Sequence, residues 1–137
     1  MSAILALDSW ILVAWLKDQN PGADYMAGLW AQADRGELRL VVNILNIGEV
    51  FYLTARKKGV EAAEKLLAHL RERPLEFLPV PDSLVLEAAR LKARYTIALG
   101  DAFAAATAMR LRCPLATGDP ELRRLEADGL LSLDWAG

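Results

Sequence analysis

The stretch Ala3-Ile4-Leu5-Ala6-Leu7-Asp8 is an apolar run that ends on a carboxylate. The same pattern returns late in the chain, in Pro114-Leu115-Ala116-Thr117-Gly118-Asp119. A short run that is apolar throughout is typical of a strand buried on both faces of a parallel sheet. In open sheets of this kind, binding sites form outside the carboxyl ends of the strands. Asp8 and Asp119 are therefore expected to lie at one functional edge.

Between these two runs, predicted strands alternate with predicted helices. Strands are expected at 3–8, 38–42, 75–79, 115–117 and 131–134. Helices are expected at 9–17, 23–35, 44–58, 60–73, 83–95, 101–112 and 120–127. Asn43 and Asp82 are expected to cap the helices that follow them. The alternation predicts an α/β fold, with a parallel sheet of four to five strands covered by helices on both faces.

Length and composition set limits on the class of protein. A chain of 137 residues suits one compact domain, residues 1–137, with a real core. The single cysteine, Cys113, excludes an intrachain disulfide and is typical of a reducing cytosol, so a cytoplasmic location is expected. No signal peptide or bilayer-spanning run is recognised, so no membrane partner is expected. The net charge of −2 argues against a basic nucleic-acid coat, but local patches among sixteen cationic side chains can still bind RNA.

Two further acids stand among apolar or small neighbours. Glu49 lies in the helical stretch 44–51, whose other members are mostly apolar, and Asp101 opens the alanine-rich stretch 102–108. Neither acid has an obvious Lys or Arg one helical turn away, nor do Asp8 and Asp119. Carboxylates are rarely placed in such surroundings without a partner. The simplest partner for all four acids is a shared divalent cation.

The type of cation follows from the ligands and from charge. Two unit charges about 4 Å apart repel by about 4 kcal/mol at an effective dielectric near 20, and a divalent ion relieves that repulsion. Oxygen ligands favour Mg²⁺, with Mn²⁺ as a substitute, over zinc. One histidine and one cysteine without metal-type spacing support the same choice. Mg²⁺ held by carboxylates most often serves phosphoryl chemistry.

Each acid also has a simpler interpretation. Asp8, Asp101 and Asp119 could all be helix N-caps, and Pro120 after Asp119 suits the first position of a helix. Glu49 could be a solvated helix residue. The set as a whole is harder to explain in this way, because caps do not need tightly packed, apolar surroundings.

Four segments resemble the motifs of the PIN-domain family, and particularly its VapC toxins. The first is Leu5-Ala6-Leu7-Asp8-Ser9, and the second is Glu49, six residues after Asn43. The third is Leu99-Gly100-Asp101-Ala102-Phe103-Ala104-Ala105-Ala106-Thr107-Ala108. The fourth is Leu115-Ala116-Thr117-Gly118-Asp119-Pro120-Glu121-Leu122. The resemblance covers essentially the whole chain, and the last two motifs are the specific ones.

The resemblance implies a three-layer α/β/α sandwich and a Mg²⁺-dependent endoribonuclease. It implies the toxin of a type II toxin–antitoxin pair, forming a homodimer and inhibited by a small antitoxin protein. A metal-activated water would hydrolyse the RNA phosphodiester. The metal-binding and catalytic acids would be Asp8, Glu49, Asp101 and Asp119. Ser9 and Thr117 would place hydroxyls around the metal. Apart from the resemblance, Asn46 is a polar residue one helical turn before Glu49 and is expected to orient it.

Other functions are weighed against this one. A dehalogenase-type phosphatase needs a second Asp two residues after the first, where this chain has Trp10. A response-regulator receiver needs a paired acid and a late lysine, and neither is evident. A catalytically silent interaction module on the same fold is a further alternative, although all four acids are present. So is a PIN-type nuclease of RNA maturation or decay that has no antitoxin.

Two surfaces are predicted to matter for partners. Cationic side chains gather at helix ends, where they either bind RNA or simply complement helix dipoles. They are Arg56, Lys57, Lys58, Arg71, Arg73, Arg90, Lys92, Arg94, Arg110 and Arg112. The first two helices carry more apolar side chains than one face can bury, among them Trp15 and Trp30. That excess predicts a surface for self-association and for an antitoxin segment.

Overall fold

The computed structural model describes residues 3–137 and contains one five-stranded sheet. Its strands are β1 (Ala3–Leu7), β2 (Leu38–Asn43), β3 (Leu75–Leu78), β4 (Leu115–Thr117) and β5 (Leu133–Trp135). Every neighbouring pair is parallel, and the order across the sheet is β3-β2-β1-β4-β5. The predicted α/β fold with a parallel sheet is confirmed. The predicted domain, 1–137, includes Met1 and Ser2, which lie outside the described residues.

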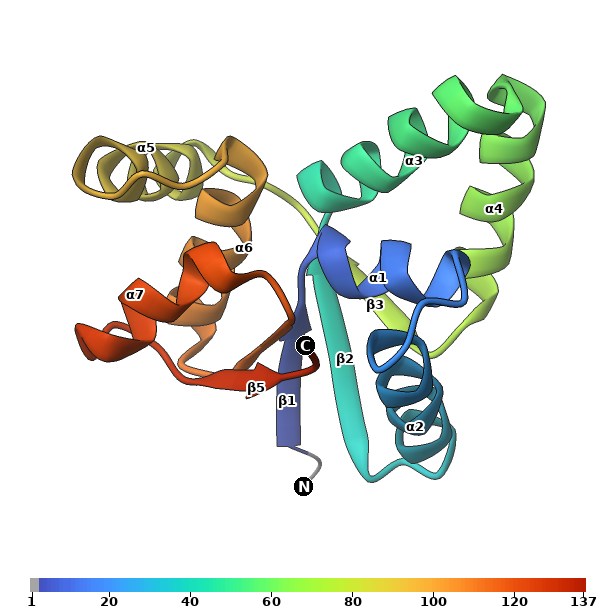
Figure 1. Cartoon of the computed structure of the whole chain (residues 1–137), viewed down its shortest axis with the longest axis horizontal. Coiled ribbons are helices and arrows are strands. Elements are labelled where there is room, and N and C mark those ends of the chain that lie inside the picture. The colour runs from blue at the N-terminus through green and yellow to red at the C-terminus, as the bar shows by residue number, and fades with distance from the viewer. Residues whose placement is uncertain (1–2) are drawn as a thin grey trace.

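Helices cover both faces of this sheet (Figure 1). They are α1 (Ser9–Leu16), α2 (Gly22–Asp34), α3 (Ile44–Lys58), α4 (Val60–Glu72), α5 (Asp82–Arg94), α6 (Leu99–Leu111) and α7 (Arg123–Ala127), with a 3₁₀ turn, η1, at Pro120–Leu122. No helix within residues 3–137 is long and apolar enough to cross a membrane.

The alternation of side chains along the strands produces two cores. Leu5 and Leu7 of β1 pack with α1 to α4, whereas Ala6 between them packs with α5, α6 and α7. Leu40 and Val41 of β2 divide in the same way. Because both sets are apolar, each strand is buried on both faces, as the continuous apolar runs predict.

Several boundaries differ from the sequence-based predictions by one or two residues. Helix α6 begins at Leu99 instead of Asp101, so Asp101 lies inside its first turn and does not cap it. Asp82 is the first residue of α5, and the cap position belongs to Pro81, which makes no side-chain cap bond. Strand β5 covers Leu133–Trp135, so it begins two residues and ends one residue later than the predicted range, 131–134. Asn43 does cap α3, because its Oδ1 accepts a hydrogen bond from the Asn46 N–H at 2.8 Å.

The apolar side chains of the first two helices lie mostly in the core, so these helices expose less apolar surface than expected, although Val13, Trp15 and Leu16 of α1 are half-buried. Ile11, Leu12 and Met26 are fully buried, and Trp30 is nearly so. These helices can hide more than one stripe because α1 lies between the sheet and its helical neighbours, with Trp15 meeting Trp30 edge-on at 5.4 Å. The large exposed apolar residues lie elsewhere, on α3 to α6: Ile44, Tyr52, Leu53, Val60, Val85, Leu86, Leu99 and Leu111.

Candidate metal centre at the carboxyl edge of the sheet

Asp8 follows β1 directly and is fully buried. Its Oδ1 accepts the Ile11 N–H at 3.0 Å, so it caps α1, and its Oδ2 accepts a short hydrogen bond from the Thr117 hydroxyl. Burial raises the pKa of Asp8 to about 7, and the charges of Asp119 and Glu49 add to that rise, while its two hydrogen bonds oppose it. The interpretation of Asp8 as a helix cap is correct. Capping alone does not explain why this carboxyl group is fully buried among other acids, where its charged form is disfavoured.

Thr117 joins the two strand ends. β4 lies beside β1 in the sheet, and the buried Thr117 hydroxyl donates to Asp8 while accepting the Asp119 N–H at 3.0 Å. Asp119 Oδ1 in turn accepts the Glu121 N–H at 3.0 Å and caps η1. One hydroxyl thus fixes the relative positions of two of the four predicted acids.

Asp101 carries the clearest sign of a missing partner. It is 7% exposed, and its Oδ2 is buried with no hydrogen-bond partner among the described residues. The pKa of Asp101 is raised to about 9. Burial is the largest cause, and the neighbouring carboxyl groups of Asp119, Asp8 and Glu121 raise it further. A hydrogen bond between two of these carboxyl groups would require a shared proton. A divalent cation would satisfy the same oxygen without one.

Three carboxylates converge closely enough to share an ion. Asp101, Asp119 and Glu121 each offer one oxygen, and these oxygens lie within 4.8 Å of one another. An oxygen-only donor set with a buried, unpartnered oxygen fits a hard divalent cation such as Mg²⁺ or Mn²⁺. Among the described residues, Asp8 and Glu49 do not belong to this closest group.

Glu121 is the acid that sequence reasoning missed. It is exposed, and its Oε2 accepts the Ala98 N–H at 3.2 Å, which holds the start of α6 against the η1 turn. Its position two residues after Asp119, in a turn beginning with Pro120, is the signal that could have identified it.

Glu49 approaches the site from α3 and packs against the backbone of α6. A Cβ atom on Gly100 would lie only 2.1 Å from Glu49 Oε2, so the absence of a side chain there makes room for the carboxylate. Asn46 Nδ2 donates to Glu49 Oε1 at 2.7 Å and to the Gly100 carbonyl at 3.1 Å. The predicted contact between Asn46 and Glu49 is therefore present.

Behind Glu49, a buried chain of polar side chains connects α3 to α6. Asn43 Nδ2 donates to Asn46 Oδ1 at 2.7 Å, to Thr107 Oγ1 at 3.0 Å and to the Phe103 carbonyl at 3.2 Å. Thr107 donates to that same carbonyl at 2.8 Å. Both asparagines are essentially inaccessible to solvent, so their amides must be satisfied by protein groups, and they bond to one another, to Glu49 and to α6.

The other residues near this edge are less informative. Ser9 begins α1 directly after Asp8 and is half-buried. Trp10 lies against Gly118, where an added Cβ would come within 2.1 Å of the indole ring, and its ring edge also reaches Gly22. Gly118 is thus required by close packing beside Asp119.

Known structures share this architecture. VapBC2 from Rickettsia felis, bound to a DNA fragment from the promoter, matches with a TM-score of 0.76 at 17% identity over 98% of this chain and 99% of that one. VapBC-1 from nontypeable Haemophilus influenzae matches with a TM-score of 0.71 at 18% identity over 96% and 97%. Mycobacterium tuberculosis VapC20, described as a sarcin–ricin loop cleaving toxin, matches with a TM-score of 0.71 at 16% identity over 88% and 93%.

These identities are too low to establish more than a common fold. No curated protein matches the chain in sequence. A family-level match is found, however, because the PIN domain covers residues 5–128, a range that includes all four predicted acids and Glu121. The chain therefore belongs to the PIN domain family.

Proposed function

We propose that this protein is a divalent-metal-dependent endoribonuclease, and that it is the toxin of a type II toxin–antitoxin pair. Two observations carry the proposal: the carboxylates of Asp101, Asp119 and Glu121 converge with Asp8 close by, and the buried Asp101 Oδ2 has no hydrogen-bond partner among the described residues. Membership of the PIN domain family supports it. So do similar structures of toxin–antitoxin complexes, including one from Klebsiella pneumoniae with a TM-score of 0.66.

The roles of the residues follow from their surroundings. Asp8, Glu49, Asp101 and Asp119 would hold Mg²⁺, or Mn²⁺ in its place, and Glu121 would join them. When bound, the metal would neutralise charge on an RNA phosphodiester and lower the pKa of a bound water. Thr117 and Asn46 keep the acids in position, and Ser9 lies at the same edge.

The group that removes a proton from the attacking water has to reach it. Asp8 is fully buried and both of its oxygens accept hydrogen bonds, so it is unsuited to that task. Glu49 and Asp119 are half-buried, and Glu121 is exposed. The general base is therefore one of these three more accessible acids.

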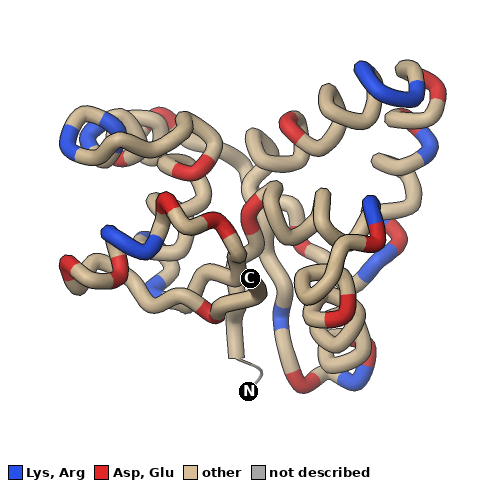
Figure 2. The backbone as a smooth tube through the Cα atoms, in the orientation of Figure 1, with Lys and Arg blue, Asp and Glu red and all other residues tan. Residues whose placement is uncertain are grey.

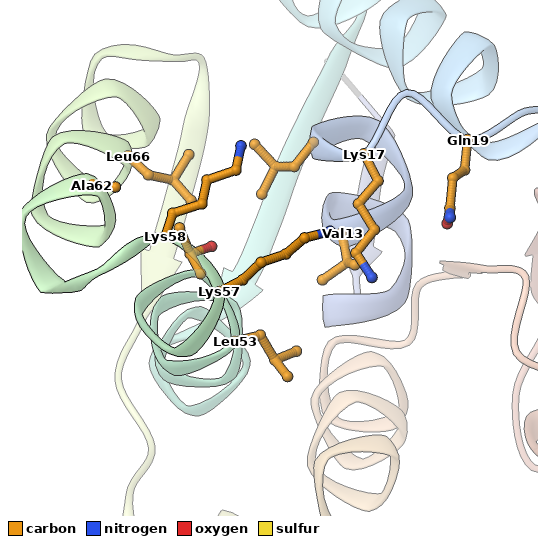
Figure 3. Close-up of a pocket in the computed structure, with 10 residues that line it drawn as sticks. Val13, Lys17, Gln19, Leu53, Lys57, Lys58, Ala62 and Leu66 are labelled. Carbon is orange, nitrogen blue, oxygen red and sulfur yellow. The ribbon is translucent and has the colours of Figure 1, made fainter.

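A groove that includes Leu53, one helical turn along α3 from Glu49, is suited to an antitoxin segment. It has a volume of about 770 Å³ and lies between α1, α3 and α4 (Figure 3). Val13, Leu53 and Leu66 contribute apolar surface, and Lys57 and Lys58 supply cations. An antitoxin segment with apolar and acidic side chains would fit this lining. An arginine of that segment could pair bidentately with the nearby acids and compete with the metal.

A homodimer would cover part of the exposed apolar surface described above. Tyr52 of α3, Val85 and Leu86 of α5, and Leu99 of α6 are all between 42% and 55% exposed, and a partner subunit would shield them from water. Sedimentation of the purified chain at micromolar concentration tests this assembly. A monomer at that concentration would contradict it. We place the protein in the cytoplasm, where RNA and a reduced Cys113 are both expected.

Incubation with total RNA tests the nuclease activity directly. Cleavage is expected with Mg²⁺ or Mn²⁺ and not with EDTA, and the mapped ends should fall at defined sites. Undegraded RNA under all metal conditions would favour a silent interaction module. Cleavage without an adjacent antitoxin reading frame would instead favour an enzyme of RNA maturation or decay.

A further inference from the structure

A second charged region lies at the C-terminal end of α6, in a groove of about 500 Å³ between α5 and α6. Four arginines line it, and Glu87 is the one acid among its lining residues. They are Arg90, Arg94, Arg110 and Arg112. Figure 2 shows cationic segments on α5, on the side of the molecule away from α3 and α4.

Only one of the four guanidinium groups is neutralised by a close carboxylate. Arg110 donates at 2.7 Å to Glu87 Oε1 and at 2.7 Å to Ser83 Oγ. Arg94 lies over the Tyr95 ring at 5.2 Å, and it helps to lower the pKa of Asp128 without forming an ion pair. Within residues 3–137, Arg90, Arg94 and Arg112 have no carboxylate within ion-pair distance.

Arg112 occupies a backbone position that favours glycine. It ends α6 in the left-handed region, with φ 53° and ψ 46°. Helices commonly end in this conformation at Gly or Asn, because a side chain there costs about 1–2 kcal/mol. The Arg112 side chain lines this groove, and it also lines a neighbouring one formed with Cys113 and Glu126.

We propose that this arginine groove binds phosphate groups of the RNA strand, at a distance from the cleavage centre. A guanidinium matches phosphate bidentately, which a lysine cannot do, and bound phosphates would relieve the repulsion between the arginines. The conclusion that the bound phosphates belong to RNA rests on the nuclease function proposed above.

The distance between the two sites suits one strand. Asp101 and Arg110 lie nine residues apart on α6, or roughly 14 Å along its axis. At about 3.4 Å per stacked nucleotide, roughly four nucleotides would span that distance. An RNA longer than this could contact the acids and the arginines together, whereas a dinucleotide could not.

The test is the salt dependence of RNA binding in EDTA, where metal-dependent cleavage cannot occur. A fluorescently labelled, unstructured 12-nucleotide RNA is titrated with the wild-type chain and with the double variant Arg90→Ala/Arg112→Gly, and its anisotropy is followed. Glycine suits the left-handed position, so the second substitution removes the cation without straining the backbone. The matched control is Arg39→Ala/Lys65→Ala, which removes the same charge from exposed positions on β2 and α4.

The groove variant should bind RNA about tenfold more weakly at low salt. Each lost phosphate contact should also reduce the slope of log affinity against log salt by about 0.7, so the loss for two arginines should be about 1.4. The control should stay within twofold of wild type. An unchanged slope, an equal loss in the control, or a preference for an acidic peptide over RNA would each overturn the proposal. Intact groove-dependent binding without any cleavage in Mg²⁺ would support the groove and contradict the nuclease function instead.

Discussion

The two ends of α6 carry opposite charges and differ in how those charges are held. At its N-terminal end, the buried Asp101 lies in a cluster of acids with the half-buried Asp119 and the exposed Glu121, and at its C-terminal end Arg110 and Arg112 are open to solvent. Both signs agree with the helix macrodipole, which favours anions at the first turn and cations at the last. The dipole does not explain the burial. Only the acidic end is dehydrated enough to raise the pKa of its carboxyl group to about 9.

This difference separates two kinds of charged site. Solvent and salt screen the arginines from one another, so that end can remain stable without a ligand. The acids are screened much less, and without a cation they must either hold protons or repel one another. The structure therefore makes the acidic end the one whose behaviour should change most with metal, pH and neutralising substitutions.

The largest expected effect is on cleavage. Asp101→Asn and Asp8→Asn should each reduce the rate by roughly 10³-fold, because a metal ligand contributes several kcal/mol of transition-state stabilisation and about 1.4 kcal/mol is a factor of ten. Asn can keep the bond that Asp8 accepts from Ile11, so helix α1 should remain capped. RNA cleavage in Mg²⁺ measures the loss, and circular dichroism checks the fold. Wild-type rates in both variants would show that the site is elsewhere.

The next effect is on stability and its pH dependence. The pKa of Asp8 is about 7 and that of Asp101 about 9 in the folded protein, against about 3.9 for Asp in an unfolded chain. Between these values the folded state binds more protons than the unfolded state, so in EDTA the free energy of unfolding should fall as pH rises from about 4 to about 9. Each unit of separation corresponds to about 1.4 kcal/mol.

Urea denaturation at pH 5 and pH 8 measures this dependence. Asp101→Asn should be more stable than wild type at pH 8 in EDTA and should show a flatter pH profile. Adding Mn²⁺ at about one hundred times its Kd should restore about 2.7 kcal/mol to the wild type. If Asp101→Asn were clearly the less stable protein at pH 8 without metal, its carboxylate would have a structural role instead.

A smaller loss of activity is expected from substitutions of residues that hold the acids in position. Gly100→Ala would force the Glu49 carboxylate away from α6, and Asn46→Ala would remove its hydrogen-bond donor. Changes to residues that orient metal ligands typically cost 10–100-fold in metal affinity or activity. Mn²⁺ affinity should fall together with cleavage in both variants. Asn46→Gln should also bind Mn²⁺ and cleave RNA less well than the wild type, because the longer side chain cannot keep the 2.7 Å contact with Asn43.

The matched control for Gly100→Ala is Gly28→Ala in α2. No atom lies within 4 Å of a Cβ added to Gly28, so that substitution should raise stability by up to about 1 kcal/mol through helix propensity and leave metal binding unchanged. Equal effects of the two glycine substitutions would contradict the proposed packing of Glu49 against Gly100.

Much of this arrangement could be predicted from sequence because its determinants are local. Apolar runs identified the strands, and the positions of Asp8 directly after β1 and of Asp119 two residues after β4 placed them at one edge. Glu121 was missed because its only local signal is its position two residues after Asp119, and an exposed acid in a turn is usually just solvated. The contact between Asn43 and Thr107 joins residues 64 positions apart, so no spacing rule could reveal it. Asp101 looked like a helix cap because the two residues before it, Leu99 and Gly100, gave no signal that α6 had already begun.

The most direct measurement is a Mn²⁺ titration followed by electron paramagnetic resonance at pH 8, in which the signal of free Mn²⁺ reports what the protein has not bound. The wild-type chain should remove Mn²⁺ from solution in a saturable way, and Mg²⁺ should compete. Asp101→Asn should leave nearly all Mn²⁺ free at the same concentrations, while Arg90→Ala/Arg112→Gly should bind as the wild type does. Equal Mn²⁺ binding by wild type and Asp101→Asn, or none by either, would contradict the assignment of the acidic end of α6 as a metal centre.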